Sequence, residues 1–295
     1  PMDLDVGPFK LSILEPMGRH RLVIESNDTN IECDLVFTPK TGVIPEGRQT
    51  LRNARHVVMD ATRIDQFGHW QGSISVEGRK IAVNSETTFG LKDRSWGIRP
   101  VGAPYEGGAP LDSFQAVHFM WLPIHWENRC TLAGVFEYED GYQWHNDQVI
   151  LPAYPTPDQI PGINDPDSQH WQGIVNHQIN FEPGTRRAQS AVVTMQNRHG
   201  ENLEISVEPL MLHRMKGLGY QNPDWGHGKW HDELKIGAEF WNLNELDPLA
   251  FENLHIQQVV KATCGNDTGY GVMEQFHLGP YKQYGFEGYF DGYQP

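Results

Sequence analysis

Apolar and polar residues alternate along most of the chain, and this period of two is typical of strands that bury one face. Turn-forming residues separate the alternating segments, as in β-sandwiches and barrels. Only Thr50–Arg55 and Leu246–Leu254 have the character of short helical turns. The pattern therefore predicts an all-β fold of two consecutive β-barrel or sandwich domains with few short helices. The candidate strands are His20–Ile24, Ile31–Phe37, Gly72–Val76, Lys80–Val83, Thr87–Arg99, Phe114–Ile124, Thr131–Tyr138, Gln148–Leu151, Gly173–Phe181, Gln189–Gln196, Leu203–Leu212, Leu234–Leu243, Leu254–Cys264 and Gly269–Leu278.

Turn signals divide the chain further. The dipeptide Glu77-Gly78 lies between two short alternating runs and predicts a hairpin. Five prolines fall within residues 152–168, a stretch that cannot continue a central strand and has the composition of an extended linker. We therefore predict an N-terminal β domain over residues 1–151 and a C-terminal β domain over residues 169–295.

The string His-Trp-Gln-Gly occurs twice, at His69–Gly72 and at His170–Gly173, each time ahead of candidate strands. Four matched residues that include tryptophan favour two related β units over coincidence.

Composition narrows the class of protein. A helical bundle is disfavoured by the 30 glycines, 20 prolines and 32 aromatic residues. The net charge of −15 argues against sequence-independent binding of nucleic acid. No apolar run approaches the ~20 residues of a membrane span, and the first ten residues lack the pattern of a signal peptide. Three cysteines, Cys33, Cys130 and Cys264, form no CxxC pair, which favours a reducing cytoplasm over a disulfide framework or a cysteine zinc site. The oligomeric state stays open.

The segment around Asp93 contains the largest group of neighbouring residues that could take part in a reaction. On a strand, Asp93 and Arg99 would share one face, with Arg94 and Trp96 on the other. One interpretation pairs Asp93 with an arginine and uses Trp96 as core filling. The other has Asp93 in an apolar cavity, where burial keeps a carboxyl protonated as a general acid and a Trp face stabilises a carbocation. A bulge at Gly97 would turn Asp93 and Trp96 to the same side.

A second string, residues 219–231, is rich in glycine and is predicted to be a loop. His227 and His231 have the spacing of two zinc ligands on a helix, but a glycine interrupts them and the HExxH pattern is missing. A histidine tuned near neutrality between two Trp rings is a better acid–base candidate. Tyr220 and Trp225 are candidates to contact a substrate.

Two further segments offer candidates. Glu274, in an apolar strand near Tyr281 and Tyr284, is either paired across a strand or protonated in a cavity. His118 and Trp121 belong to an aromatic strand that lines a ligand pocket or fills a core. The chain has no GxSxG elbow, P-loop, HExxH or GxGxxG that opens a βαβ unit, so chemistry without a cofactor and plain ligand binding both gain support.

These residues resemble the lipocalin-like superfamily of hydroxyneurosporene synthase (carotenoid 1,2-hydratase), the CrtC/AttH-like group, with fungal decalin-forming Diels–Alderases as distant relatives. The resemblance rests on the Trp70–Gly72 string, on Lys92–Arg99 and on the closing Gly271–Gly285 segment. It implies two consecutive lipocalin-like domains with an apolar substrate in or between them. Its hydratases protonate an isolated double bond and capture the cation with water, whereas its cyclising members position a polyene.

The chain departs from the family pattern at two places. The family string resembles Asp-His-Ser-Trp-Gly, and Arg94 stands where His is usual, which removes a candidate proton donor. The resemblance to the carotenoid hydratases also implies an aromatic–acid pair on a later strand, whereas Phe114–Trp126 contains no carboxylate and the next one is Glu127.

The resulting hypothesis is a cofactor-independent, metal-free hydratase, isomerase or cyclase that acts on a double bond of a hydrophobic isoprenoid- or polyketide-like molecule. Asp93 is the candidate acid, Trp96 stabilises the cation, Arg99 orients a polar group, and His227 and Glu274 are further acid–base candidates. One alternative is a lipocalin-like carrier without chemistry. A third is a carbohydrate-active sandwich with two carboxyl groups roughly 5–10 Å apart. The candidate substrate-binding residues are Arg94, His118, Trp121, Tyr220, Trp225, Tyr281 and Tyr284.

Overall fold

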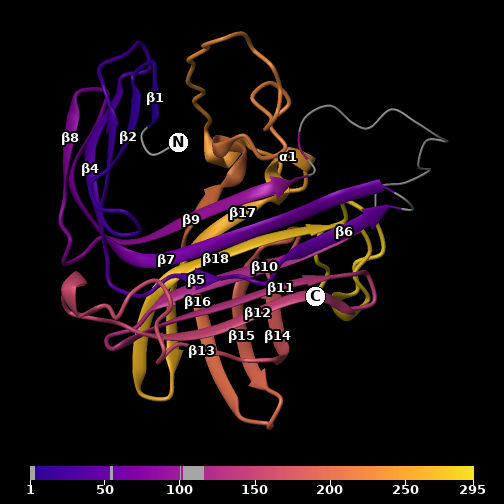
Figure 1. The fold of residues 1–295 in the computed structure, drawn as a ribbon. Helices are drawn as coiled ribbons and strands as arrows, with labels where there is room; N and C mark the ends of the chain where they lie inside the picture. The colour runs from indigo at the N-terminus through magenta and orange to yellow at the C-terminus, as the bar shows by residue number, and fades with distance from the viewer. Residues whose placement is uncertain (1–3, 54–55, 100, 102–115) are drawn as a thin grey trace.

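The computed structural model describes residues 4–53, 56–99, 101 and 116–295, and it arranges these residues in two antiparallel sheets (Figure 1). The first sheet takes its nine strands from the N-terminal third of the chain. In chain order they are β1 (Leu4–Val6), β2 (Phe9–Ile13), β3 (His20–Ile24), β4 (Ile31–Pro39), β5 (Ile44–Pro45), β6 (Gln49–Asn53), β7 (His56–Val76), β8 (Arg79–Val83) and β9 (Phe89–Ile98).

Strand β7 organises the first sheet because its 21 residues pair with five other strands. One edge of β7 pairs successively with β6, β5 and β4, and the other edge pairs with β9 and β8. Strands β1–β4 and β8 curl away at one end of β7 and form a half-barrel, while β9 follows its middle (Figure 1). The middle of β7 is thereby left to face the second sheet.

The second sheet follows the order β13-β12-β11-β10-β18-β17-β16-β15-β14. It curls until its two ends approach each other. There the Gln143 side chain exchanges hydrogen bonds with the backbone of Val175, at 2.6 and 3.3 Å, and Gln148 does the same with Gln196, at 3.2 and 2.8 Å. Its strands are β10 (Val117–His125), β11 (Arg129–Glu137), β12 (Gln143–Pro152), β13 (Gln169–His170), β14 (Gly173–Phe181), β15 (Ala188–Asn197), β16 (Asn202–Arg214), β17 (Ile256–Cys264) and β18 (Asp267–Leu278).

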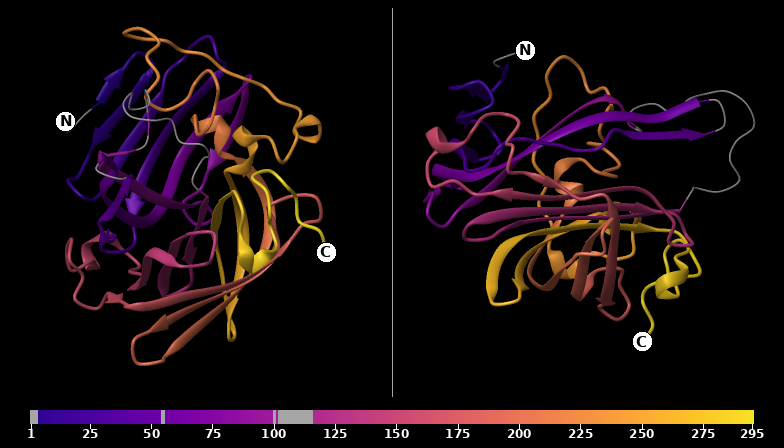
Figure 2. Two further views of the ribbon diagram at one scale, coloured as in Figure 1. Left: turned by 90° about the vertical axis from the view of Figure 1, so that its right-hand side faces the viewer. Right: turned by 60° about the horizontal axis from the view of Figure 1, so that its bottom comes forward.

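Two hydrophobic clusters hold the fold together. The larger fills the concave side of the second sheet and includes Met120, Leu122, Val193 and Ile205. The smaller packs the first sheet on the outside of the second, where β7 and β9 run over β10 and β18 (Figures 1 and 2). This second cluster consists of Ile44, Phe67, Phe119, Trp121, Cys130, Leu132, Val149 and Leu151.

Helical structure is short and lies in connections: the 3₁₀ helices η1 (Pro157–Gln159), η2 (Met215–Leu218), η3 (Leu243–Glu245) and η4 (Lys282–Tyr284), and the α-helix α1 (Phe251–Leu254). No helix among the described residues is long and apolar enough to cross a membrane. The longest connection, residues 215–255, leaves the second sheet and reaches the first (Figure 1). We call it the crossing loop.

The predicted fold class is confirmed, since the chain forms two curled antiparallel sheets with few short helices. The hairpin at Glu77-Gly78 is also confirmed, with both residues at positive φ, 48° and 77°, as a tight two-residue turn requires. Two assignments are wrong. Thr50–Arg55 was expected to be helical, and its described part belongs to β6. Leu234–Leu243 was expected to be a strand, but it pairs with no strand that the structure describes and lies in the crossing loop.

The predicted linker, residues 152–168, does not coincide with the division between the sheets. The chain leaves the first sheet after β9 and enters the second at β10, so residues 117–152 already belong to the second sheet. The proline-rich stretch connects β12 to β13 within that sheet. Its prolines end β12 without starting a new layer.

The repeated His-Trp-Gln-Gly strings occupy different positions, one inside β7 and one across the gap between β13 and β14. Their glycines share a local role. A Cβ at Gly72 would lie 2.0 Å from the Asp34 carbonyl oxygen, and one at Gly173 would lie 1.9 Å from that of Gln196. Each glycine lets two strands approach closely, and a common origin of the two units stays a prediction.

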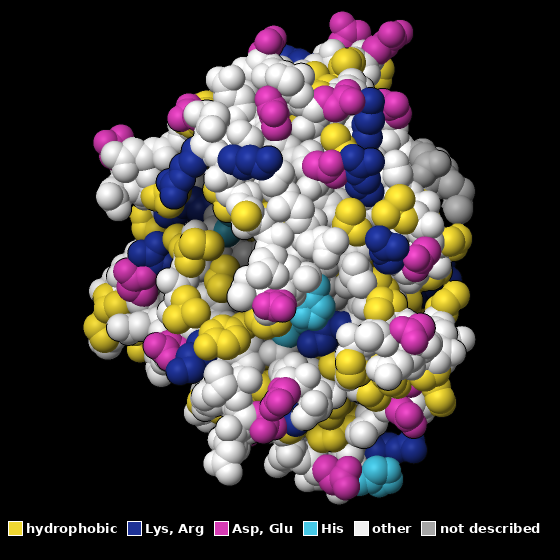
Figure 3. Space-filling model, turned by 90° about the vertical axis from the view of Figure 1, so that its left-hand side faces the viewer, with side chains coloured by type: hydrophobic (Ala, Val, Ile, Leu, Met, Phe, Trp, Pro, Cys, Tyr) yellow, Lys and Arg dark blue, Asp and Glu magenta, His cyan; other side chains and the backbone are white. Residues whose placement is uncertain are grey.

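Charged side chains of both signs spread over the face of the molecule in Figure 3, with hydrophobic side chains in groups between them. The net charge of −15 is therefore not gathered into one acidic field on this face.

Candidate functional site

A group of polar side chains interrupts the apolar packing between the two sheets. Arg63 and Asp65 project from β7 and Asp93 from β9, and the register pairs Asp65 directly with Asp93. The second sheet contributes Trp121 from β10 and Glu274 from β18, which are also paired in register. We call this group the inter-sheet cluster; it consists of Glu46, Arg63, Asp65, Asp93, Trp121, His255 and Glu274.

Arg63 lies between two carboxylates at the centre of the cluster. Its Nη1 is 3.6 Å from Glu46 Oε2 and its Nε is 3.4 Å from Asp93 Oδ1. Glu46 is buried, and its Oε1 accepts a hydrogen bond of 3.1 Å from the indole nitrogen of Trp121. Arg63 therefore balances the charge of the buried Glu46 carboxylate and orients the carboxylate of Asp93.

Asp93 combines contact with solvent and a dense protein environment. Its side chain is 44% exposed, yet enough protein surrounds it that desolvation raises the pKa of its carboxyl. Arg63 and Arg99 oppose this rise, and the negative charges of Glu46 and Glu274 add to it. A carboxyl that is reachable from solvent and keeps its proton at higher pH than usual has the properties of a general acid.

Glu274 is held from both sides. Its Oε1 lies 2.6 Å from His255 Nε2, and its Oε2 accepts a hydrogen bond of 2.7 Å from Gln257. The His255 ring packs against Tyr220, which in turn packs against His227, with ring centroids 4.7 and 4.4 Å apart. Of the two readings of Glu274 left open by the sequence, the pairing across a strand is the one observed.

His227 lies outside the inter-sheet cluster. It is exposed on the crossing loop, and its Nε2 bonds the Leu218 carbonyl at 2.6 Å. Among the described residues, its ring contacts reach the cluster through Tyr220 and His255.

Trp96 and Arg94 project from the face of β9 opposite Asp93. The β7–β9 register continues without a shift through Gly97, so the expected bulge is absent from this described pair of strands. Trp96 is 51% exposed. Arg94 lies near His20 and Lys92; burial is the main cause that lowers the pKa values of these two residues, and the charge of Arg94 lowers them further. The aromatic ring of the inter-sheet cluster is that of Trp121, whose indole nitrogen bonds Glu46. Arg99 is near the cluster, and its Nη1 bonds Ser95 Oγ at 2.6 Å.

Three other predicted residues gather in a separate buried cluster inside the second sheet. His118 stacks on Tyr281 with ring centroids 3.8 Å apart, and Tyr284 bonds His177 Nδ1 at 2.6 Å. Tyr281 also donates a hydrogen bond to Glu137. These side chains attach the C-terminal segment to the sheet and lie apart from Asp93.

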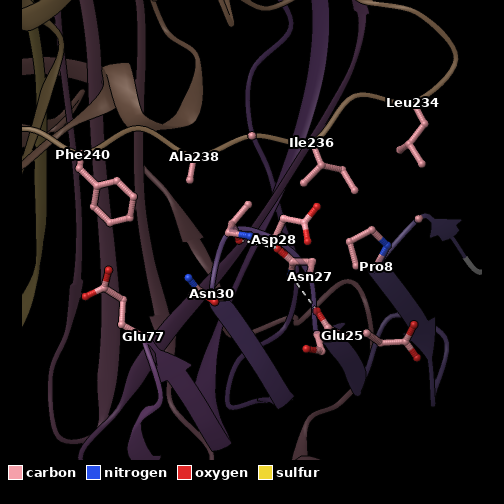
Figure 4. Close-up of a pocket in the computed structure, with 14 residues that line it drawn as sticks. Pro8, Glu25, Asn27, Asp28, Asn30, Glu77, Leu234, Ile236, Ala238 and Phe240 are labelled. Atoms are coloured by element: carbon pink, nitrogen blue, oxygen red, sulfur yellow. Dashed lines mark hydrogen bonds between the residues drawn. The ribbon is translucent and has the colours of Figure 1, made fainter.

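Trp225 lies at the rim of the first half-barrel, where the crossing loop meets β2, β3 and β4. It lines a cavity of about 410 Å³ with Phe9, Ile24 and Trp241. A neighbouring cavity of about 560 Å³ is shown in Figure 4. There Leu234, Ile236, Ala238 and Phe240 project from the loop toward Asn27, Asp28 and Asn30. We call these two spaces the rim cavities.

Sequence reasoning missed Glu46, Arg63, Asp65 and His255. The candidate strands left out residues 56–71, the part of β7 that carries Arg63 and Asp65, and no motif links these residues to Asp93. Among the described residues, no group of three or more His, Cys, Asp and Glu side chains has an arrangement that could hold a metal ion.

Comparisons with known proteins identify a family and a similar fold. A family model described as a family of unknown function (DUF8625) matches residues 1–287. The crystal structure of a protein from Nitrosomonas europaea, provisionally assigned as AttH, is similar with a TM-score of 0.52 and 15% identity, over 94% of this chain and 70% of that chain. That likeness concerns the fold. No curated protein matches the sequence.

Proposed function

The chain is a member of the family of unknown function DUF8625, and we propose that it is a cofactor-independent acid–base enzyme. Its substrate would be a hydrophobic isoprenoid- or polyketide-like molecule, and its reaction the hydration, isomerisation or cyclisation of a double bond. The observation that carries the proposal is the position of Asp93 and Glu274, which come from different sheets. They lie near enough for the charge of Glu274 to add to the rise that burial causes in the pKa of Asp93, and Trp121 is the register partner of Glu274.

In the proposed reaction Asp93 gives its proton to one carbon of the double bond, which leaves a cation on the other carbon. The raised pKa of Asp93 supports this role because the acid form persists. The ring of Trp121 stabilises the cation, and the His255–Glu274 pair accepts the proton that an attacking water or a neighbouring carbon releases. Arg99 orients a polar group of the substrate.

The test begins with native mass spectrometry of freshly purified protein, which identifies any hydrophobic molecule that co-purifies. The released compound is then incubated with the protein in deuterated water. Protonation of a double bond by a solvent-derived proton incorporates deuterium whichever product forms. We expect Asp93→Asn to lower incorporation by at least about 100-fold while the circular dichroism spectrum stays unchanged.

A matched control is Asp60→Asn, which removes a carboxylate of β7 that is paired with Arg48 on the protein surface. It should leave incorporation unchanged. Unfolding of the Asp93→Asn variant would instead favour a purely architectural Arg63–Asp93 ion pair.

The rim cavities favour a second candidate, a non-catalytic carrier of a hydrophobic ligand. Their apolar walls include the exposed Phe240 and Leu234. A carrier would bind the co-purifying compound without incorporating deuterium, and Phe240→Ser would weaken that binding. Incorporation that depends on Asp93 rejects the carrier.

A further inference from the structure

Asp65 is the most deeply buried acid of the inter-sheet cluster. Its side chain is 0% exposed, and among the described residues neither of its carboxyl oxygens has a partner that is a fixed donor. A carboxylate without donors in such a place carries a large desolvation cost, whereas a neutral carboxylic acid does not.

The carboxyl that faces Asp65 is that of Glu46. Strand β5 pairs Ile44 with Asp65, the Glu46 N–H bonds the Arg63 carbonyl two residues along, and the pKa of Asp65 is raised by burial and then by the charge of Glu46. Two buried carboxyl groups in such a position avoid the repulsion of two like charges when one of them carries a proton. Glu46 already accepts the Trp121 indole N–H at one oxygen and faces Arg63 at the other. Glu46 is therefore the ionised member of the pair, and Asp65, which has no such donors among the described residues, holds the proton.

The charges around Asp65 favour the same assignment. It is faced by Glu46 from the β5–β6 connection, by Arg63 on its own strand and by Asp93 on β9, and Glu274 of β18 acts on Asp93 from the second sheet. Four carboxyls thus share the two guanidinium groups of Arg63 and Arg99. Burial first, and then the charge of Glu46, raise the pKa of Asp65 well above its ordinary value.

Asp65 and Asp93 are also in position to exchange a proton. They are direct partners in the antiparallel β7–β9 pair and point to the same face. In such pairs the Cβ atoms are about 4.5–5.5 Å apart, a separation that two carboxyl groups span directly or through one water.

We propose that Asp65 and Glu46 hold one proton between them and act as a proton store that recharges Asp93. This inference rests on the proposed function. When the Asp93 O–H bond breaks and a C–H bond forms on the substrate, Asp93 becomes a carboxylate. The Asp65 proton then passes to Asp93, and the Asp65–Glu46 pair takes up a proton from solvent. The His255–Glu274 pair returns to solvent the proton released later in the cycle, so the count balances.

The first test is infrared spectroscopy of the resting protein at neutral pH, where a protonated carboxyl has its own C=O stretching band that shifts in deuterated water. We expect this band in Asp93→Asn, where Asp93 cannot contribute to it, and its loss in the double variant Asp65→Asn/Asp93→Asn. Asp60→Asn, which removes a carboxylate whose pKa is held low by Arg48, should leave the band unchanged. Absence of the band in Asp93→Asn would overturn the proposal without any variant at Asp65.

The second test is the rate of deuterium incorporation. Asp65→Asn keeps a neutral donor for Glu46, so we expect an intact fold, an unchanged Michaelis constant and a kcat lowered by about 10- to 100-fold. An unchanged kcat would overturn the role of Asp65 as a store. Undiminished incorporation by Asp93→Asn would reject the proposed function itself, and with it the recharging step, while the infrared result would still report the shared proton.

Discussion

The hydroxyl group of Tyr281 donates a hydrogen bond to the carboxylate of Glu137, a residue 144 positions earlier in the chain. The same carboxylate lies 2.9 Å from His177 Nε2 and accepts a hydrogen bond of 3.0 Å from Gln143. All of this takes place inside the second sheet, where Glu137 and Tyr281 are buried. One ionised carboxylate thus joins β11, β14 and the C-terminal segment.

Replacing Glu137 by glutamine removes the charge that these donors share. We expect Glu137→Gln to lower the free energy of unfolding by about 2–4 kcal/mol, measured by urea denaturation. The control Glu139→Gln changes an exposed carboxylate that is 3.4 Å from Lys282 and should cost less than about 0.5 kcal/mol. Equal losses in the two variants would contradict the role given to Glu137.

The pH dependence of the Glu137 contribution has a defined sign. Although burial acts to raise the pKa of Glu137, the hydrogen bonds from His177, Tyr281 and Gln143 outweigh it and lower the pKa. The native state then binds fewer protons than the unfolded state, so this stabilisation is present above the ordinary carboxyl pKa and is lost as pH falls through the lowered one. The difference between wild type and Glu137→Gln should therefore shrink in acid.

Arg186 fastens the C-terminal segment by another route. Its guanidinium donates hydrogen bonds to backbone carbonyls of four residues and packs over the Phe286 ring. Lysine cannot supply this fork of donors, so Arg186→Lys should destabilise the protein by about 2 kcal/mol or more and speed proteolysis after residue 278. Arg187→Lys, which changes a partly exposed pair with Glu182, should do neither.

His277 is a buried polar side chain, and among the described residues neither ring nitrogen has a partner. Burial lowers its pKa well below the ordinary value, so the unfolded state binds more protons than the native state below about pH 6.5. Stability due to the neutral ring is therefore lost as pH falls below that point. We expect His277→Leu to leave stability at neutral pH equal or higher and to flatten the fall toward pH 5, measured by urea denaturation at each pH. A steeper fall would refute the assignment, and the exposed His199→Gln should leave the profile unchanged.

How much of the molecule the sequence could predict depends on how local the signal is. Glu77-Gly78 is a turn signal complete within two residues, and the hairpin formed where predicted. Asp93 and Trp96 are three residues apart, so the period of a strand by itself places them on opposite faces of β9, as observed. The expectation that they share a face came only from the bulge at Gly97, which the register does not contain.

Long-range contacts were beyond such reasoning. Arg63 and Glu46 meet because β5 pairs with one edge of β7. Asp65 meets Asp93 because β9 pairs with the other edge of β7. This register is set by the packing of two sheets. In Leu234–Leu243 the apolar residues alternate as in a strand, but they line the rim cavities in place of a sheet partner.

The chain passes from the first sheet to the second between β9 and β10, and this point divides the inter-sheet cluster between two segments of the chain. Arg63, Asp65 and Asp93 precede this point, and Trp121, His255 and Glu274 follow it. If the chain were divided there, each fragment would carry only part of the inter-sheet cluster and an uncovered apolar face. On the proposed function, neither fragment would be active alone, and the two would have to reassociate before the carboxyls could act together.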